Sequence, residues 1–169
     1  MKTPGKTMIG RDQIQKRVEE LGREITEDFQ GREIDVVGVL NGAFIFLADL
    51  VRQLPYTCKV HLVRAKSYRA TSQSETIDLE ALPDLKGREV LLVEDILDSG
   101  KTLSVIMDKI NQMNPKSLKT CVLLEKTGPD REVLRADFRG FLVEDVWVVG
   151  YGLDMDENYR NLPYIAELV

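Results

Sequence analysis

The feature that most constrains the fold of this chain is a unit that occurs twice: a short apolar run, a polar turn and an amphipathic helix. Residues 35–40 form the first run, and Asn41 and Gly42 form its turn. Apolar residues then recur at helical spacing over 44–54, and residues 89–113 repeat the same order. Apolar strands that alternate with amphipathic helices predict an α/β fold, with a mostly parallel central sheet flanked by helices.

Further elements of both kinds are expected along the rest of the chain. Apolar residues at helical spacing predict a helix over 12–29, with Gly31 as its stop. Strands are expected over 60–65, 89–93, 118–124, 138–143 and 146–149. The polar stretch 67–78 has no periodicity, and we expect a mobile loop there. Because open α/β sheets bind ligands at the carboxyl ends of their strands, the site is expected at the turns after Leu40, Val93, Leu124 and Val149.

The size and charge of the chain narrow its class. Its 169 residues predict a single domain over 1–169, and the absence of long apolar runs predicts a cytoplasmic protein with no membrane partner. The formal net charge of -5 lacks the basic field of a nucleic-acid binder. An anionic ligand would therefore be held locally, by helix N-termini, a few cations and a divalent metal.

Three residues with reactive side chains are assigned no chemistry. Cys58 and Cys121 stand singly in apolar stretches, without the spacing of a metal or redox site, and are expected to be buried free thiols. His61 lies within an apolar run and is interpreted as a structural histidine.

The turn after the second apolar run carries the strongest chemical pattern in the chain. Gly100, Lys101 and Thr102 look like the end of a nucleotide-binding P-loop, but that motif requires glycine where this chain has Asp95. A carboxylate there would face nucleotide phosphates, so a P-loop is excluded. Small residues leading into a helix instead suit a sugar phosphate, bound by backbone N–H groups and the helix dipole.

Two adjacent acids, Glu94 and Asp95, precede this turn. In a strand their side chains are expected to diverge, which suits two ribose hydroxyls better than joint chelation of one ion. Adjacent acids at a strand end are most often simply solvated. The apolar run before them and the phosphate-type turn after them favour a functional interpretation.

The order of apolar strand, two acids and a short turn ending in Ser99-Gly100-Lys101-Thr102 resembles the phosphoribosyl pyrophosphate (PRPP) motif of the type I phosphoribosyltransferases. Further segments resemble the hypoxanthine-guanine branch of that family: residues 37–49, 66–68, 123–126, 148–154 and 159–164. The resemblance implies a small hood formed by the N- and C-terminal segments. It also implies a glycosyltransferase of purine salvage that uses Mg²⁺, converts PRPP and hypoxanthine or guanine into IMP or GMP and pyrophosphate, and forms a homodimer or homotetramer.

The resemblance assigns Asp98 as the general acid/base at the purine N7. The chemistry agrees, because loss of the N7 proton makes the reacting purine nitrogen a better nucleophile; the alternative is an aspartate that only caps the helix. The residues implied to bind the ribose and 5'-phosphate are Glu94, Asp95, Ser99, Gly100, Lys101 and Thr102.

The remaining assignments come from the same resemblance. Lys126 would donate to the purine 6-oxo group, Trp147 would stack on the base, and Val148 would offer main-chain groups, although a lone tryptophan is more often part of a core. Asp154 is placed near the purine and the metal, with Glu94 and Asp95 as the other candidate metal ligands. Asn41, Gly42 and Arg160 would bind pyrophosphate, and Asn41 departs from the basic residue that the family often has there.

Two other functions share this fold. One is a regulator that senses PRPP and binds nucleic acid, which the acidic charge of the chain disfavours. The other is a phosphoribosyltransferase for another base, such as xanthine or a pyrimidine.

Overall fold

The computed structural model describes residues 3–55, 57–71, 74–79, 82–128 and 134–169, and for residues 66–71 and 74–79 it describes the backbone alone. In this part of the chain the larger sheet has the order β4 (Ser74–Leu79), β3 (Lys59–Thr71), β2 (Ile34–Leu40), β5 (Glu89–Leu97), β6 (Ser117–Lys126) and β7 (Phe138–Val143). The strands β3, β2, β5, β6 and β7 run parallel to one another, and β4 is antiparallel to β3. The predicted α/β fold with a mostly parallel sheet is confirmed.

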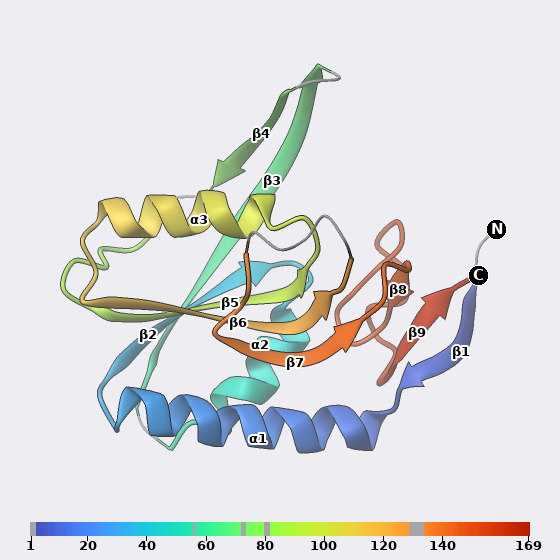
Figure 1. Ribbon diagram of the computed structural model, residues 1–169, viewed down its shortest axis with the longest axis horizontal. Coiled ribbons are helices and arrows are strands. Elements are labelled where there is room, and N and C mark those ends of the chain that lie inside the picture. The colour runs from blue at the N-terminus through green and yellow to red at the C-terminus, as the bar shows by residue number, and fades with distance from the viewer. Residues whose placement is uncertain (1–2, 56, 72–73, 80–81, 129–133) are drawn as a thin grey trace.

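Helices cover both faces of this sheet. Figure 1 shows α1 (Arg11–Phe29) and α2 (Phe44–Val51) on one face and α3 (Lys101–Gln112) on the other. Alternate residues of each central strand pack on opposite faces: Val36 belongs to the core under α1 and α2, and Val37 to the core under α3. Both faces of the strand are therefore buried, which explains its continuous apolar sequence.

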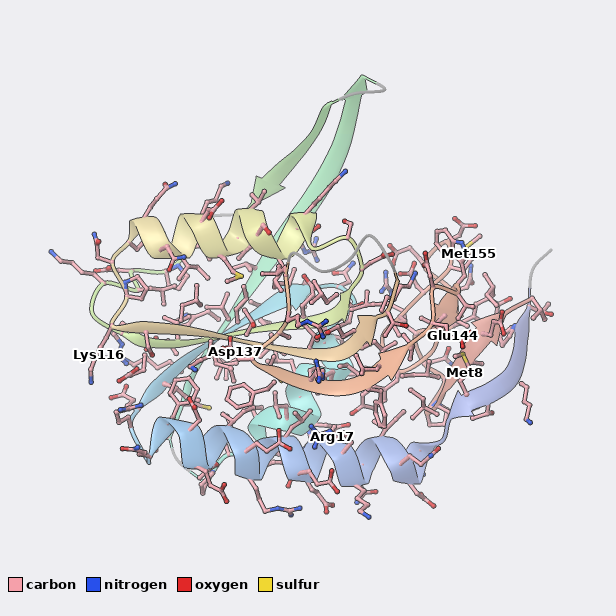
Figure 2. All side chains as sticks on the ribbon, viewed as in Figure 1. Met8, Arg17, Lys116, Asp137, Glu144 and Met155 are labelled. Carbon is pink, nitrogen blue, oxygen red and sulfur yellow. The ribbon has the colours of Figure 1, made fainter. Side chains whose placement is uncertain are left out.

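The helix α1 illustrates how the sequence pattern produces an element. Its buried residues follow the 3.6-residue period: Ile14, Val18, Leu21, Gly22, Ile25 and Phe29. The chain leaves the helix through Gln30, in the left-handed region at φ 51°, and Gly31, at φ 74°. Arg17 reaches from α1 toward β7 (Figure 2) and donates to the carbonyl oxygens of Arg139 and Gly140, so α1 is also tied to the sheet by hydrogen bonds.

The prediction of a loop over 67–78 is wrong. The strand β3 continues to Thr71 and pairs antiparallel with β4, from Ala65 opposite Leu79 to Thr71 opposite Ser74. This hairpin extends away from the rest of the sheet (Figure 1). A hairpin outside the core is held by its backbone ladder and needs no alternating apolar face, so periodicity could not reveal it.

The smaller sheet has the order β1 (Pro4–Ile9), β9 (Ile165–Leu168) and β8 (Val148–Val149). Backbone hydrogen bonds between Thr3 and Val169, of 2.9 and 3.0 Å, join the two ends of the described chain. This sheet lies beyond the carboxyl ends of the parallel strands (Figure 1), and it is the expected hood of terminal segments. The strand predicted over 146–149 is reduced to its last two residues.

His61 lies at the opposite end of the large sheet, where it contacts a buried carboxylate. Its Nε2 lies 2.8 Å from Oδ1 of the buried Asp35, and the guanidinium of Arg88 donates to Oδ2 of the same carboxylate at 2.6 Å. Burial opposes ionisation of Asp35, but the hydrogen bonds from His61 and Arg88 outweigh it and lower its pKa. His61 therefore has a structural partner.

Cys121 is buried, Cys58 is half-buried, and both are free thiols. None of the described helices combines the length and the apolar character needed to cross a bilayer.

Candidate functional site

A cavity of about 340 Å³ opens at the carboxyl edge of the parallel strands. Ten of the residues proposed from the sequence line it: Asn41, Gly42, Glu94, Asp95, Asp98, Ser99, Gly100, Thr102, Asp154 and Arg160. They come from the ends of β2 and β5 and from a distant segment near the carboxyl terminus. The edge of the sheet expected to bind a ligand thus carries the cavity.

The turn from β5 into α3 has the features that favour an anion. Gly100 is the N-cap of α3 and has φ 77°, a conformation that glycine adopts without a steric penalty. The first turn of α3 contains no acidic side chain, so its N–H groups and its dipole remain attractive to a negative ligand. Lys101 is exposed at the first helical position and, unlike its neighbours, does not line the cavity.

The acids Glu94 and Asp95 lie within β5, which continues to Leu97, and not at its end. The prediction that their side chains diverge is wrong. Asp95 Oδ1 accepts from the N–H of Ile96 at 2.8 Å, and Glu94 Oε1 accepts from the N–H of Asp95 at 3.3 Å, so both carboxyls turn toward the same stretch of backbone and interact. Burial, followed by the charge of Asp95, raises the pKa of Glu94 well above its usual value, and burial also raises the pKa of Asp95.

The turn after β2 packs directly on Asp95. The Leu40–Asn41 peptide bond is cis, and a Cβ added to Gly42 would lie 1.7 Å from Oδ2 of Asp95. Only a residue without a side chain fits there. The Asn41 side chain is exposed at the mouth of the cavity.

The segment Gly150–Arg160, which we name the carboxyl-terminal loop, packs on that turn in the same way. A Cβ on Gly152 would lie 2.2 Å from the carbonyl oxygen of Gly42. The Arg160 guanidinium is 2.8 Å from Asp154 and 3.1 Å from Glu157, and its Nη1 donates to the carbonyl of Gly152 at 2.7 Å. Arg160 is thus held in one position at the cavity, within a largely acidic surrounding.

A second group of side chains adjoins the cavity through Asp98. Lys126, at the end of β6, has its Nζ 3.1 Å from Asp98 and 3.1 Å from Asp145, and only 9% of its side chain is exposed. The same nitrogen lies 6.0 Å from the ring centroid of Trp147, within the range of a cation–π interaction. Trp147 is 67% exposed, so it is not the core aromatic that a lone tryptophan usually is. Its neighbour Val148 is buried in β8.

Sequence reasoning missed two residues of this arrangement, Asp145 and Glu157. Asp145 follows β7 as the second member of an acidic pair with Glu144, the same pattern that directed attention to Glu94 and Asp95 on β5. That repetition was an available signal. Glu157 has none, because its contact with Arg160 depends on the path of the carboxyl-terminal loop.

The side chains of Lys66, Ser67 and Tyr68, which also carried the family resemblance, lie outside what the structure describes.

The candidate metal ligands suit a hard cation only together with a substrate. Within the described ranges no group of three or more His, Cys, Asp or Glu side chains converges. The pair Glu94 and Asp95 nevertheless places two carboxyls of raised pKa in the cavity wall, where a divalent cation would favour their ionised forms. Oxygen ligands from a bound phosphate would complete such a site.

Comparisons with known proteins identify the family of this chain. The family described as phosphoribosyl transferase domain matches residues 10–156. The hypoxanthine phosphoribosyltransferase of Escherichia coli (strain K12) is 41% identical over 175 aligned positions, covering 100% of this chain and 98% of that protein. A crystal structure of a hypoxanthine-guanine phosphoribosyltransferase from Bacillus anthracis matches with a TM-score of 0.87 and 39% identity over 100% of both chains. A hypoxanthine phosphoribosyltransferase from Trypanosoma cruzi, complexed with the product IMP, matches with a TM-score of 0.90 and 31% identity over 98% of this chain and 91% of that one.

Proposed function

The chain belongs to the phosphoribosyltransferase family, in its hypoxanthine-guanine branch, and we infer from this premise how its site performs purine salvage. The enzyme transfers the 5-phosphoribosyl group of PRPP to hypoxanthine or guanine and forms IMP or GMP. In this step the bond between C1' and the pyrophosphate oxygen breaks, a bond from C1' to the purine nitrogen forms, and pyrophosphate leaves.

The observation that carries the proposal is the pairing of Lys126 with Asp98 at 3.1 Å beside the phosphate-type turn. On a 6-oxopurine, the 6-oxo oxygen and N7 are neighbouring atoms on one edge. A cation and a carboxylate held side by side match that edge: Lys126 donates to the oxygen, and Asp98 accepts the N7 proton as the base attacks. An adenine would present its amino group to the donor Lys126, so the pair also favours 6-oxopurines.

The exposed face of Trp147 supports a stacking role for this side chain. Because the ring is 67% exposed and lies close to Lys126, a planar base can lie against it while Lys126 reaches the base edge. Val148, although buried as a side chain, would contribute its backbone groups to the same edge.

The other half of the cavity would bind PRPP. The N-terminus of α3, with Ser99, Gly100 and Thr102, would hold the 5'-phosphate, and the carboxylates of Glu94 and Asp95 would accept from the ribose hydroxyls. The turn Asn41-Gly42 and Arg160 would bind pyrophosphate, Arg160 through a guanidinium whose fork suits phosphate oxygens.

Mg²⁺, which we propose as the cofactor, would be held by Glu94, Asp95 and Asp154 together with PRPP oxygens and would neutralise the leaving pyrophosphate. The test is direct: EDTA should abolish turnover, and added Mg²⁺ should restore it. Turnover that persists in EDTA would exclude this role.

We further propose that residues 1–169 act as one catalytic domain in the cytoplasm, where the polyanionic donor is confined by the membrane. We also propose a homo-oligomer, as the family resemblance implies; exposed apolar side chains such as Phe44 on α2 and Val60 and Leu62 on β3 are available to an interface. Light scattering coupled to size-exclusion chromatography would report its size, and a monomer at all concentrations would contradict it.

The decisive experiment for the function is a steady-state assay with PRPP, Mg²⁺ and four bases: hypoxanthine, guanine, xanthine and uracil. We expect turnover with hypoxanthine or guanine at a kcat/KM well above that for the other two. Preference for xanthine or uracil would overturn the proposed substrate class while leaving the family in place.

A further inference from the structure

A partly buried hydrogen bond outside the active-site cavity joins two segments that both lead to residues proposed to bind pyrophosphate. The hydroxyl of Tyr151, in the carboxyl-terminal loop, donates to Oδ2 of Asp49 on α2 at 2.5 Å. Neither residue lines the active-site cavity; both line a second one, of about 580 Å³, between α1, α2 and the carboxyl-terminal loop. The contact therefore lies outside the site described above.

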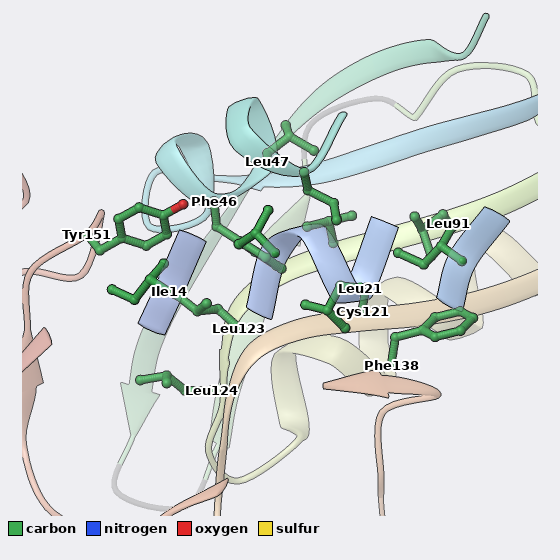
Figure 3. Packing of buried hydrophobic residues seen from close by; sticks show 14 of the residues in the cluster. Ile14, Leu21, Phe46, Leu47, Leu91, Cys121, Leu123, Leu124, Phe138 and Tyr151 are labelled. Atoms are coloured by element: carbon green, nitrogen blue, oxygen red, sulfur yellow. The ribbon is translucent and has the colours of Figure 1, made fainter. Parts of the chain in front are cut away.

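Tyr151 is firmly held at this position. The residue is 7% exposed, and its ring packs in the core with Ile14 and Phe46 (Figure 3), where its hydroxyl points toward α2. Burial, followed by the hydrogen bond and the charge of Asp49, raises the pKa of the phenol, so it stays protonated as the donor. On the other side, Arg52 forms an ion pair with Asp49 and orients its carboxylate.

The backbone around Tyr151 shows what this anchor holds. Tyr151 has φ 52°, an uncommon conformation for a bulky residue, and its neighbours Gly150 and Gly152 have φ 102° and 103°. Such a run persists only where surrounding contacts hold it in place. The ring and the hydroxyl of Tyr151 hold this run through their side-chain contacts. The N–H groups of Tyr151 and Gly152 donate to the carbonyls of Leu162 and Arg160 and hold its backbone.

Two glycines connect the segment around Tyr151 to the active site. Gly152, next to Tyr151, packs on the carbonyl of Gly42, and Gly42 packs on Asp95. Asp49 is part of α2, which follows the Asn41-Gly42 turn directly in the chain. The hydrogen bond therefore closes a ring of contacts that contains the turn, the helix after it and the loop that carries Asp154 and Arg160.

We propose that Tyr151 and Asp49 are positioning residues that set the spacing between the Asn41-Gly42 turn and the Asp154–Arg160 pair. This inference rests on the proposed function, because it takes those two segments to be the ones that grip the pyrophosphate of PRPP. Loss of this hydrogen bond displaces the Asn41-Gly42 turn relative to the Asp154–Arg160 pair. Lys126 and Trp147, on the proposed purine side, stay in place.

The test is Tyr151→Phe, which removes the hydroxyl and keeps the ring. We expect the KM for PRPP and the product-inhibition constant of pyrophosphate to rise roughly three- to tenfold, about what the net loss of one ordinary hydrogen bond allows, with the KM for hypoxanthine unchanged. Asp49→Ala should give the same pattern, and the double variant should add little to either single change. Asp49→Asn, which keeps an oxygen to accept from the phenol, should restore the KM for PRPP toward that of the unaltered enzyme.

A matched control separates positioning from general stability. Thr120→Val also removes one buried hydroxyl that donates to an aspartate, Asp137, but at the β6–β7 contact away from the cavity. It should lower Tm by a similar amount and leave both Michaelis constants unchanged. If Tyr151→Phe behaves like Thr120→Val, or if Asp49→Asn behaves like Asp49→Ala, the positioning role is wrong.

A second control keeps this result apart from the proposed function. Arg160→Gln removes the cation that is proposed to bind pyrophosphate directly. If Arg160→Gln raises the KM for PRPP and Tyr151→Phe does not, only the positioning role fails. If Arg160→Gln also leaves that KM unchanged, the assignment of the pyrophosphate half itself fails.

Discussion

The two sides of the active-site cavity are built in different ways. The side proposed to bind the 5'-phosphate is one continuous segment, in which the end of β5, a turn with Gly100 at φ 77° and the start of α3 follow each other in the chain. The second side, which we propose binds the purine and the pyrophosphate, is assembled from segments far apart in the sequence, such as those of Gly42, Lys126 and Arg160. The first depends mainly on backbone groups and the second on side chains that tertiary packing brings together, so the two should respond differently to substitution.

The largest effect is expected at Asp98, where the two sides meet. Asp98→Asn keeps the size of the side chain but removes the base, so kcat should fall by about 10²–10⁴-fold while PRPP binding changes little. Single-turnover rates and PRPP titration would measure both. Asp145→Asn is the matched control, because it alters the other carboxylate that lies 3.1 Å from Lys126 Nζ, and its loss of kcat should be much smaller. An unchanged kcat in Asp98→Asn would remove this residue from proton transfer.

The next largest effect is expected at Gly42, where the turn after β2 packs closely on Asp95. In Gly42→Ala the new Cβ would lie 1.7 Å from Asp95 Oδ2, so the turn or the carboxylate must move. A displacement of about 1 Å in a site that positions substrates can cost roughly 10²-fold in kcat/KM, and we expect a loss of that order for PRPP.

The control for this prediction is Gly87→Ala. Gly87 has φ 66° but nothing within 4 Å of an added Cβ. The substitution should lower the free energy of unfolding by about 1 kcal/mol through backbone strain and leave kcat/KM unchanged. Equal kinetics in Gly42→Ala and Gly87→Ala would show that the contact between Gly42 and Asp95 is irrelevant to PRPP.

A smaller effect, confined to one substrate, is expected at Lys126. Lys126→Ala removes the charge-assisted hydrogen bond that we propose to the 6-oxo group, so the KM for the purine should rise about tenfold and the KM for PRPP much less. Lys119→Ala, at the other end of β6 and also ion-paired, should change neither constant. Equal effects on both substrates would contradict a contact between Lys126 and the base.

The smallest effect is expected at Asn41, where this chain departs from the basic residue often found in its family. Because the side chain is exposed, Asn41→Lys adds a solvent-screened cation, which should tighten PRPP binding by about two- to fivefold. Calorimetric Kd values for PRPP and inhibition constants for pyrophosphate, both with Mg²⁺ present, would detect it. No change in either constant would mean that side chains at this position point away from the leaving group.

The side of the cavity that is one continuous segment could be predicted from the sequence better than the side assembled from distant segments. The turn from Asp98 to Thr102 could be read directly because its spacing, glycine and following helix are local features. The outer part of the hairpin β3–β4 was missed because it extends away from the rest of the sheet (Figure 1) and its sequence carries no apolar alternation. The geometry of Glu94 and Asp95 was also mispredicted, since an ideal strand rule ignores the hydrogen bonds that draw both carboxyls to one stretch of backbone.

The sequence by itself determined the order of the central strands and helices, the edge of the sheet where the cavity lies and the turn proposed to bind an anion, because these depend on interactions between residues close in the chain. Tertiary structure alone decided that Lys126 lies between Asp98 and Asp145, that Arg160 is ion-paired with Asp154, and that Gly152 packs on Gly42. Such contacts are set by the register of parallel strands and by the packing of distant loops. Their distances are fixed only when the whole sheet and both of its helical layers have formed.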